Sequence, residues 1–215
     1  MKRWIGGWVA ILMFVPVLAH AAGFEEGRSY MEVPFPTKVV TGKKVEVREF
    51  FWYGCPHCYV LEPGLTLWLK KLPANAEFVR TPGLAAPAWR LDAQAYYTFK
   101  ALGVEEKLHG AFFKAAQESR GTMTNENAVA DFAASHGIDR KKFIETFGSF
   151  SVHVDLEKAK QLNEDLNINS VPTFVVDGRY LTSPAMAEGE DKFFKLLDYL
   201  IEKAAKERKT KAVKH

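Results

Sequence analysis

Hydrophobic and polar residues alternate along Lys44–Tyr53, the pattern of a β-strand. Apolar residues fall on both faces, which predicts a central strand: Val45, Val47, Phe51 and Tyr53 on one face, Phe50 and Trp52 on the other. Glu49 shares the face of Val45 and Val47. Because a buried carboxylate is costly, we expect its pKa to be raised and its side chain to lie near the site where the strand ends. A partly wet face is the alternative.

The chain's only two cysteines follow this strand directly, in the sequence Cys55-Pro56-His57-Cys58. Pro56 suits the first position of a helix, because its missing N–H would have no partner there. The apolar pattern continues this helix to Leu72, with a kink expected at Pro63. A Cys-x-x-Cys pair at a helix start places the first sulfur over unpaired N–H groups and the positive end of the helix dipole, which favour a thiolate. The pattern is typical of a thiol–disulfide exchange catalyst.

A Cys-x-x-Cys pair can also serve three other purposes. A structural disulfide would close a loop of two residues and remove little entropy from the unfolded chain. Zinc needs four ligands, and the others would have to come from the scattered histidines, His57, His109, His136 and His153. Attachment of c-type haem is excluded because Tyr59 stands where a histidine is required. We therefore expect neither a metal nor a cofactor, and we expect His109 and His153 to be solvated or capped, and not ligands.

The first 21 residues resemble a secretory signal peptide. Lys2 and Arg3 precede a mostly apolar stretch, Ile5–Leu18, and Ala19-His20-Ala21 offers small residues for cleavage after Ala21. An uncleaved anchor is the alternative, but a spanning helix needs about 20 apolar residues. Export to an oxidising space, the periplasm in bacteria, favours a catalyst that makes or rearranges disulfides.

Composition indicates an ordinary globular protein, with 47% hydrophobic and 26% charged residues. The formal charge of +3 becomes about +1 without the signal peptide, which argues against a nucleic-acid partner. Basic residues gather from Lys203 onward, where only Glu207 is acidic. A frayed, solvated terminal helix explains this cluster, and an electrostatic partner site is the alternative.

A strand at Glu77–Thr81 would complete a strand–helix–strand unit and so a parallel sheet. Between Pro82 and Val152 the pattern predicts four helices: Ala88–Leu102, Glu105–Ser119, Asn125–His136 and Asp139–Phe147. Thr124 and Asp139 are the expected N-caps, and the expected C-caps are Gly103, Gly121, Gly137 and Gly148. The remaining segments are a helix at Asp155–Leu166, a hairpin of Thr173–Val176 and Arg179–Thr182 with Asp177-Gly178 as its turn, and a helix at Glu190–Lys206.

Taken together, these features resemble the DsbA family of periplasmic disulfide oxidases over almost the whole mature chain. The resemblance rests on the signal peptide, on Phe50-Phe51-Trp52-Tyr53-Gly54 before the cysteine motif, on the helical insertion and on Val171-Pro172-Thr173 before the hairpin. It implies an α/β thioredoxin fold with an inserted all-helical domain. The implied division is a signal peptide at 1–21, a discontinuous thioredoxin-like domain at 22–82 and 153–215, and a helical insertion at 83–152.

The resemblance also implies roles for single residues. Cys55 corresponds to the exposed nucleophile and Cys58 to its buried partner, with His57 tuning the thiolate beside Pro56. Pro172 corresponds to a cis-proline facing the disulfide, and Val171 would contact the substrate chain. The acidic residues near the motif are Glu49, expected to move protons near Cys58, and Glu62. Implied partners are reduced, newly exported proteins and an inner-membrane, quinone-linked DsbB-type reoxidant, and we expect a monomer.

The direction of exchange depends on the acidity of Cys55. A pKa of about 4 would stabilise the reduced protein at pH 7 by roughly 4 kcal/mol and raise its reduction potential by about 90 mV. The alternatives to an oxidase are a disulfide isomerase or reductase of the same superfamily and a non-catalytic peptide-binding module with a structural disulfide. The absence of an additional dimerisation domain counts against the dimeric isomerase type.

Overall fold

The computed structural model describes residues 23–118 and 123–213, so the predicted signal peptide lies outside the described residues. In chain order the elements are β1 (Met31–Glu32), β2 (Val45–Phe51), α1 (Pro56–Leu69), β3 (Ala76–Pro82), the 3₁₀ turn η1 (Pro87–Trp89), α2 (Arg90–Ala101), α3 (Glu105–Glu118), α4 (Glu126–Ser135), α5 (Arg140–Phe147), α6 (Phe150–Asp165), β4 (Thr173–Val176), β5 (Tyr180–Thr182) and α7 (Glu190–Val213).

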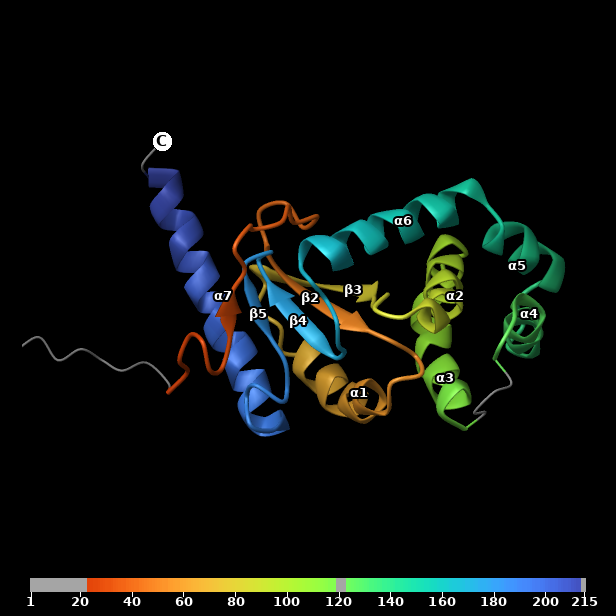
Figure 1. The fold of residues 1–215 in the computed structure, drawn as a ribbon, viewed down its shortest axis with the longest axis horizontal. Helices are drawn as coiled ribbons and strands as arrows, with labels where there is room; N and C mark the ends of the chain where they lie inside the picture. Colours follow the sequence, from red (N-terminus) through yellow and green to blue (C-terminus); the bar gives the residue numbers. More distant parts are fainter. Residues whose placement is uncertain (1–22, 119–122, 214–215) are drawn as a thin grey trace, which may run out of the picture.

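One five-stranded sheet, in the order β1-β5-β4-β2-β3, organises the molecule (Figure 1). β2 is central and wholly buried, and it pairs in parallel with β3, as the strand–helix–strand pattern predicts. Its other neighbour, β4, is antiparallel. The carboxyl end of β2 therefore meets the start of β4, which brings the cysteine motif beside the segment around Pro172.

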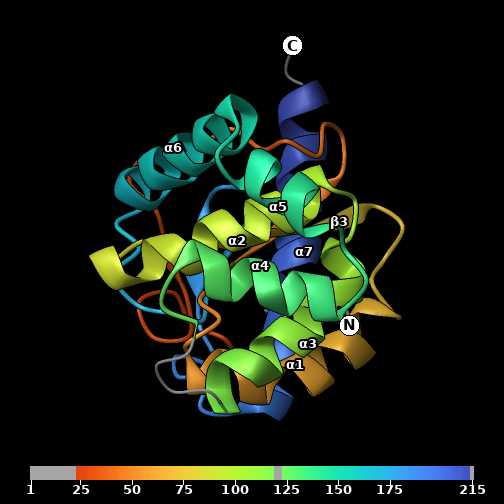
Figure 2. The same ribbon diagram turned by 90° about the vertical axis from the view of Figure 1, so that its right-hand side faces the viewer.

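The two faces of the sheet carry different helices. α1 and α7 cover the face of Val45 and Val47, with Leu61, Leu65 and Leu200 buried against it. α6 covers the opposite face through its C-terminal turn (Figure 1). The helical block α2–α5 lies beyond the end of β2, and Figure 2 shows it stacked in front of the sheet. Its core includes Phe51 and Tyr53, so the end of β2 packs into the helical insertion.

Several helix boundaries differ from the sequence expectation. α6 starts at Phe150, earlier than the expected Asp155, because Ser149 accepts a hydrogen bond from the N–H of Val152 and caps the helix. Asn125, and not Thr124, caps α4. Gly103 and Gly137 have the positive φ that is typical of a glycine at a helix C-terminus. Gly148 is the C-cap of α5 but has a negative φ, −83°. Gly121 lies outside the described residues.

The Asp177-Gly178 hairpin turn is confirmed: both residues have positive φ, 58° and 64°, as a two-residue turn of this kind requires. β1 and η1 were not predicted, because elements of two and three residues are too short to show a hydrophobic periodicity.

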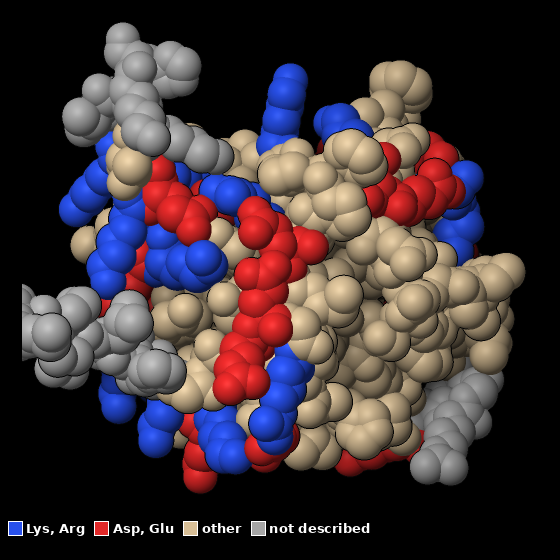
Figure 3. Space-filling view, turned by 60° about the vertical axis from the view of Figure 1, so that its left-hand side comes forward, with Lys and Arg blue, Asp and Glu red and all other residues tan. Residues whose placement is uncertain are grey.

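The last helix is longer than expected, because α7 continues past Lys206 to Val213. Arg208 pairs with Asp177 at the hairpin and donates to the backbone carbonyls of Gly42 and Lys43. Glu207 accepts from Arg179, Tyr180 and Lys203. Acidic and basic side chains are mixed on this side of the molecule (Figure 3). The basic end of α7 is thus partly neutralised within the fold.

Candidate active site

The turn from β2 into α1 holds the first cysteine at the start of the helix. Cys55 has an extended backbone (φ −83°, ψ 115°) and is the N-cap of α1, with Pro56 in the first turn. Its N–H donates to the carbonyl of Trp52 at 2.9 Å, and its sulfur accepts from the N–H of Cys58 at 3.4 Å. The sulfur takes the place that a Ser or Asp oxygen commonly fills at a helix N-terminus.

The two sulfurs differ strongly in acidity. Both cysteines are free thiols here, and Cys58 is fully buried as expected. Cys55 was expected to be exposed, which is wrong for this structure: it is only 6% exposed. A hydrogen bond from the Cys58 thiol lowers the pKa of Cys55 to about 6, helped by backbone N–H groups of Cys58 and His57 and by the charge of the His57 side chain, and opposed by burial. Burial raises the pKa of Cys58 far above its usual value. These pKa shifts have the directions expected from the sequence, lowered for Cys55 and raised for Cys58.

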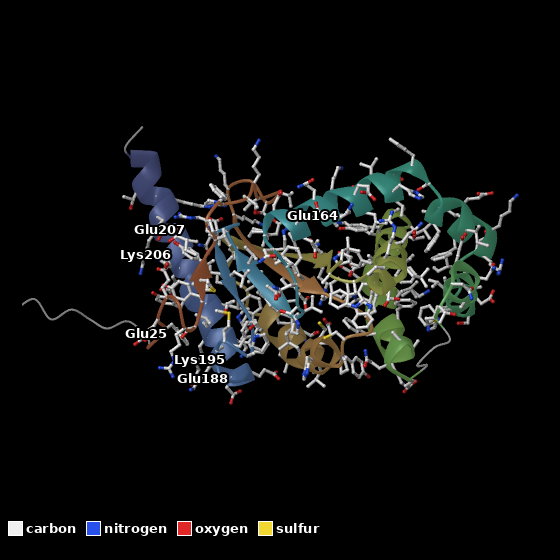
Figure 4. All side chains as sticks on the ribbon, in the orientation of Figure 1. Glu25, Glu164, Glu188, Lys195, Lys206 and Glu207 are labelled. Atoms are coloured by element: carbon white, nitrogen blue, oxygen red, sulfur yellow. The ribbon has the colours of Figure 1, made fainter. Side chains whose placement is uncertain are left out.

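The segment before β4 faces Cys55. The Val171-Pro172 peptide bond is cis, and the Cys55 sulfur lies 3.4 Å from the carbonyl oxygen of Val171. A groove of about 600 Å³ opens beside it, lined by His57, Val60, Leu61, Ser170, Val171, Pro172, Ser183, Pro184, Ala185, Glu188, Gly189 and Glu190. Figure 4 places Glu188, on its rim, at the opposite end of α7 from Lys206 and Glu207. The basic tail is therefore remote from the reactive sulfur.

Glu49 and Glu62 both pair with the same residue, Arg80. Nε of Arg80 lies 3.2 Å from Oε2 of Glu49, and Nη2 contacts both oxygens of Glu62 at 3.2 and 3.1 Å. Burial raises the pKa of Glu49 to about 8 against the pull of Arg80, which confirms the raised value expected from its place on β2. The charge of Glu49 in turn raises the pKa of Cys58, so the two groups are electrostatically linked.

Sequence reasoning missed Arg80 and misjudged His109. Arg80 is the register partner of Glu49 in the parallel pair β2–β3, a relation visible only once the two predicted strands are aligned. His109 was expected to be solvated or capped, and solvation is wrong: it is 5% exposed, with Nδ1 3.0 Å from the Tyr53 hydroxyl and Nε2 3.4 Å from Oε1 of Glu62. Nothing in the local pattern of α3 indicates this contact with α1.

The aromatic run before the cysteines divides into two groups. Phe50, Phe51 and Tyr53 are buried in the core, at 0–1% exposure. Trp52 is half-buried and stacks on Trp89, with ring centroids 4.8 Å apart and an interplanar angle of 11°. The run is therefore mainly core, and only Trp52 reaches the surface beside Cys55.

Comparison with known proteins agrees with this geometry. A family model described as a DSBA-like thioredoxin domain matches residues 88–201. The thiol:disulfide interchange protein DsbA of Pseudomonas aeruginosa is 39% identical over 91% of this chain and 92% of its own length. That of Azotobacter vinelandii is 40% identical over 84% and 85%. The chain belongs to the DsbA family.

Solved structures extend the DsbA likeness to the fold. The crystal structure of Pseudomonas aeruginosa DsbA superposes with a TM-score of 0.83 at 40% identity, covering 88% of this chain and 98% of that one. The Neisseria meningitidis oxidoreductase NmDsbA1 gives a TM-score of 0.77 at 25% identity, covering 87% and 97%. The expected thioredoxin fold with a helical insertion is confirmed, and the protein is a protein disulfide oxidoreductase of the DsbA type.

Membership of the DsbA family implies protein substrates and, in general, a DsbB-type reoxidant. DsbA proteins are periplasmic. Among the helices of residues 23–118 and 123–213, none is both long and apolar enough to cross a membrane.

Proposed function

We propose that this protein is an oxidase, which passes a Cys55–Cys58 disulfide to reduced, newly exported proteins in the periplasm. The observation that carries this direction is the acidity of Cys55: its sulfur caps α1 and has a pKa of about 6. A thiolate that is stable in the reduced protein makes the disulfide a good acceptor of electrons.

The reaction has two steps. A substrate thiolate attacks the sulfur of Cys55, the Cys55–Cys58 bond breaks, and Cys58 leaves as a thiolate. A second substrate thiolate then attacks the substrate sulfur of this mixed disulfide and releases Cys55 as a thiolate. The substrate has lost two electrons and the Cys55/Cys58 pair has gained them. Reoxidation by a quinone-linked, DsbB-type partner of the inner membrane would restore the disulfide.

The neighbouring residues have assigned roles in this proposal. Pro56 fixes the start of α1, and His57 stabilises the thiolate of Cys55. The buried Cys58 thiolate takes its proton from Glu49, whose pKa of about 8 keeps a proton available at neutral pH. Glu62 shares Arg80 with Glu49. Extended substrate chains would lie along Val171 and Pro172, where backbone contacts tolerate many sequences.

We also propose the domain division expected from the sequence, with a signal peptide at 1–21, a thioredoxin-like domain at 22–82 and 153–215, and a helical insertion at 83–152, in a protein that acts as a monomer. Its second boundary falls inside α6, which spans Phe150–Asp165. The same helix would then connect the two parts.

Oxidation of a reduced, unfolded substrate by stoichiometric disulfide-form protein tests the oxidase. We expect one substrate disulfide per protein molecule and no reaction with the Cys55→Ser variant. The equilibrium with glutathione supplies the second measurement. A reduction potential as low as that of a cytosolic reductant such as thioredoxin, about −270 mV, would replace the oxidase with a reductase.

A further inference from the structure

The groove beside Cys55 has acidic side chains where α7 begins. Its wall is otherwise mainly apolar, as at Val60, and includes His57 of the cysteine motif. Glu188 and Glu190 also line the groove, whereas no lysine or arginine of the described residues does. A peptide bound in this groove would therefore meet negative charge from α7.

The two carboxylates differ in their partners. Oε1 of Glu188 accepts a hydrogen bond from Nη2 of Arg28 at 2.7 Å, and Oε2 accepts one from Nζ of Lys192 at 3.0 Å. The charge of Glu188 is thus compensated within the protein. The carboxylate of Glu190 has neither an ion pair nor a hydrogen bond with any residue that the structure describes, and its side chain is exposed. Its negative charge is therefore available to a bound chain.

A glycine in the middle of α1 makes room for the carboxylate of Glu190. A Cβ added at Gly64 would overlap Oε1 of Glu190 and would lie 3.0 Å from Cε2 of Phe194. The carboxylate thus packs directly on the backbone of α1, and Figure 1 shows the first turn of α7 beside that helix. Glycine is unfavourable in the interior of a helix, and this close approach is what requires it here. The contact gives the Glu190 carboxylate a defined place on the groove.

We propose that Glu190 is a specificity-determining residue of the exchange reaction: its carboxylate, seated on Gly64, pairs with a lysine or arginine side chain of the substrate segment in the groove. This inference rests on the proposed function, in which extended substrate chains lie along Val171 and Pro172. It names a substrate class, exported proteins with a basic residue near the cysteine that reacts with Cys55. A basic side chain suits the groove because its apolar stem can lie along the wall while its charged end reaches the carboxylate.

The test uses peptides with a single cysteine, activated as 2-pyridyl disulfides. The Cys55 thiolate of the reduced protein attacks the peptide sulfur, the bond to the pyridyl sulfur breaks, and pyridine-2-thione leaves with the electron pair. Its absorbance reports formation of the mixed disulfide between Cys55 and the peptide. Lysine, norleucine or glutamate is placed at each of the three positions on either side of the cysteine. Each rate is divided by the rate of the same peptide with 2-mercaptoethanol, which removes the effect of the peptide's charge on its own disulfide.

At the position that reaches Glu190, the corrected rate should be about 3-fold higher for lysine than for norleucine, the effect of an exposed ion pair. Glutamate should be slower than norleucine. High salt should bring the lysine-to-norleucine ratio toward one, because salt screens exposed charges.

Three variants separate the charge of Glu190 from its position. Glu190→Gln should bring the lysine-to-norleucine ratio to about one. Gly64→Ala keeps every charge but displaces the carboxylate, so this ratio should also fall; the overlap is with the end of a flexible side chain, which can move without unfolding the protein. Asp191→Asn is the matched control. It removes the same charge from the first turn of α7 at a residue that does not line the groove, and it should keep the ratio near 3.

Equal corrected rates for lysine and norleucine at every position would overturn the proposal. An equal loss of the preference in Asp191→Asn and Glu190→Gln would do so too, as would an unchanged ratio in Gly64→Ala. The readout does not depend on the direction in which the protein exchanges disulfides. A protein that preferred lysine but failed to oxidise reduced substrates would therefore contradict the proposed function and leave the role of Glu190 intact.

Discussion

At the scale of the residue, the acidity of Cys55 comes from where its sulfur lies in the chain. The pKa of about 6 is higher than the value of 4 considered from the sequence. It lies one unit below pH 7, so the thiolate stabilises the reduced protein by about 1.4 kcal/mol, equal to about 30 mV for two electrons. The rise in reduction potential has the expected sign, and it is about one third of the roughly 90 mV that a pKa of 4 would give.

His57 contributes to this acidity less than the helix start does. Its charge follows the hydrogen bonds from Cys58 and the backbone among the effects that lower the pKa of Cys55. We expect His57→Ala to raise that pKa by less than about one unit and to lower the reduction potential by less than about 30 mV. Thiolate absorbance and glutathione equilibria measure both. His136→Ala, a change in the helical insertion, should alter neither, and a shift of two units in His57→Ala would assign the acidity to the imidazole instead.

Glu49 makes stability depend on pH. Its pKa is raised from 4.5 to about 8, so the folded protein binds more protons than the unfolded chain between these values, and stability falls as the pH rises through them. Glu49→Gln should remove this decline, worth about 3–4 kcal/mol between pH 5 and pH 8. Urea unfolding of the reduced proteins at several pH values measures it. An equally steep decline in the variant would show that Glu49 does not carry the effect.

At the scale of the element, prediction worked where the information was local. The alternation along β2, the proline after Cys55 and the Asp177-Gly178 turn each specify one short segment, and all three are present. Arg80 and His109 could not be assigned because their partners come from other elements. The start of α6 was predicted too late, at Asp155, because the first turn of the helix has little apolar periodicity. Ser149 caps the helix there and was not recognised as its N-cap.

The hairpin turn permits a matched pair of substitutions. Gly178 and Gly42 both have positive φ, 64° and 62°, but an added Cβ at Gly178 would strike the carbonyl oxygen of Thr37, whereas Gly42 faces open space. Both Gly→Ala variants should lose about 1 kcal/mol for the backbone conformation. Gly178→Ala should lose at least 1 kcal/mol more through this contact. Equal losses in thermal or urea unfolding would show that Thr37 moves aside freely.

At the scale of the whole molecule, the redox state and the pH should act together on stability. The depressed pKa of Cys55 means that the unfolded reduced chain holds more protons than the folded one between about pH 6 and its unfolded value near 8.5, so this contribution grows as the pH rises. In the disulfide form Cys55 does not titrate. The stability of the reduced protein minus that of the oxidised protein should therefore increase by about 2 kcal/mol from pH 6 to pH 8.

Parallel denaturant unfolding of the two forms measures this difference. The Cys55→Ser variant, which has no disulfide form, should lack the rise in stability with pH that the thiolate gives to the reduced protein. A difference that stays flat or declines over this range would mean that Cys55 carries no stabilised thiolate in the folded protein.

The most direct measurement is the ultraviolet absorbance of thiolate in the reduced protein as a function of pH. We predict a transition near pH 6 that disappears in Cys55→Ser, with Cys58 remaining protonated throughout the range in which the fold is intact. A transition of Cys55 at the ordinary cysteine value near 8.5 would contradict the proposal that this sulfur makes the protein an oxidant.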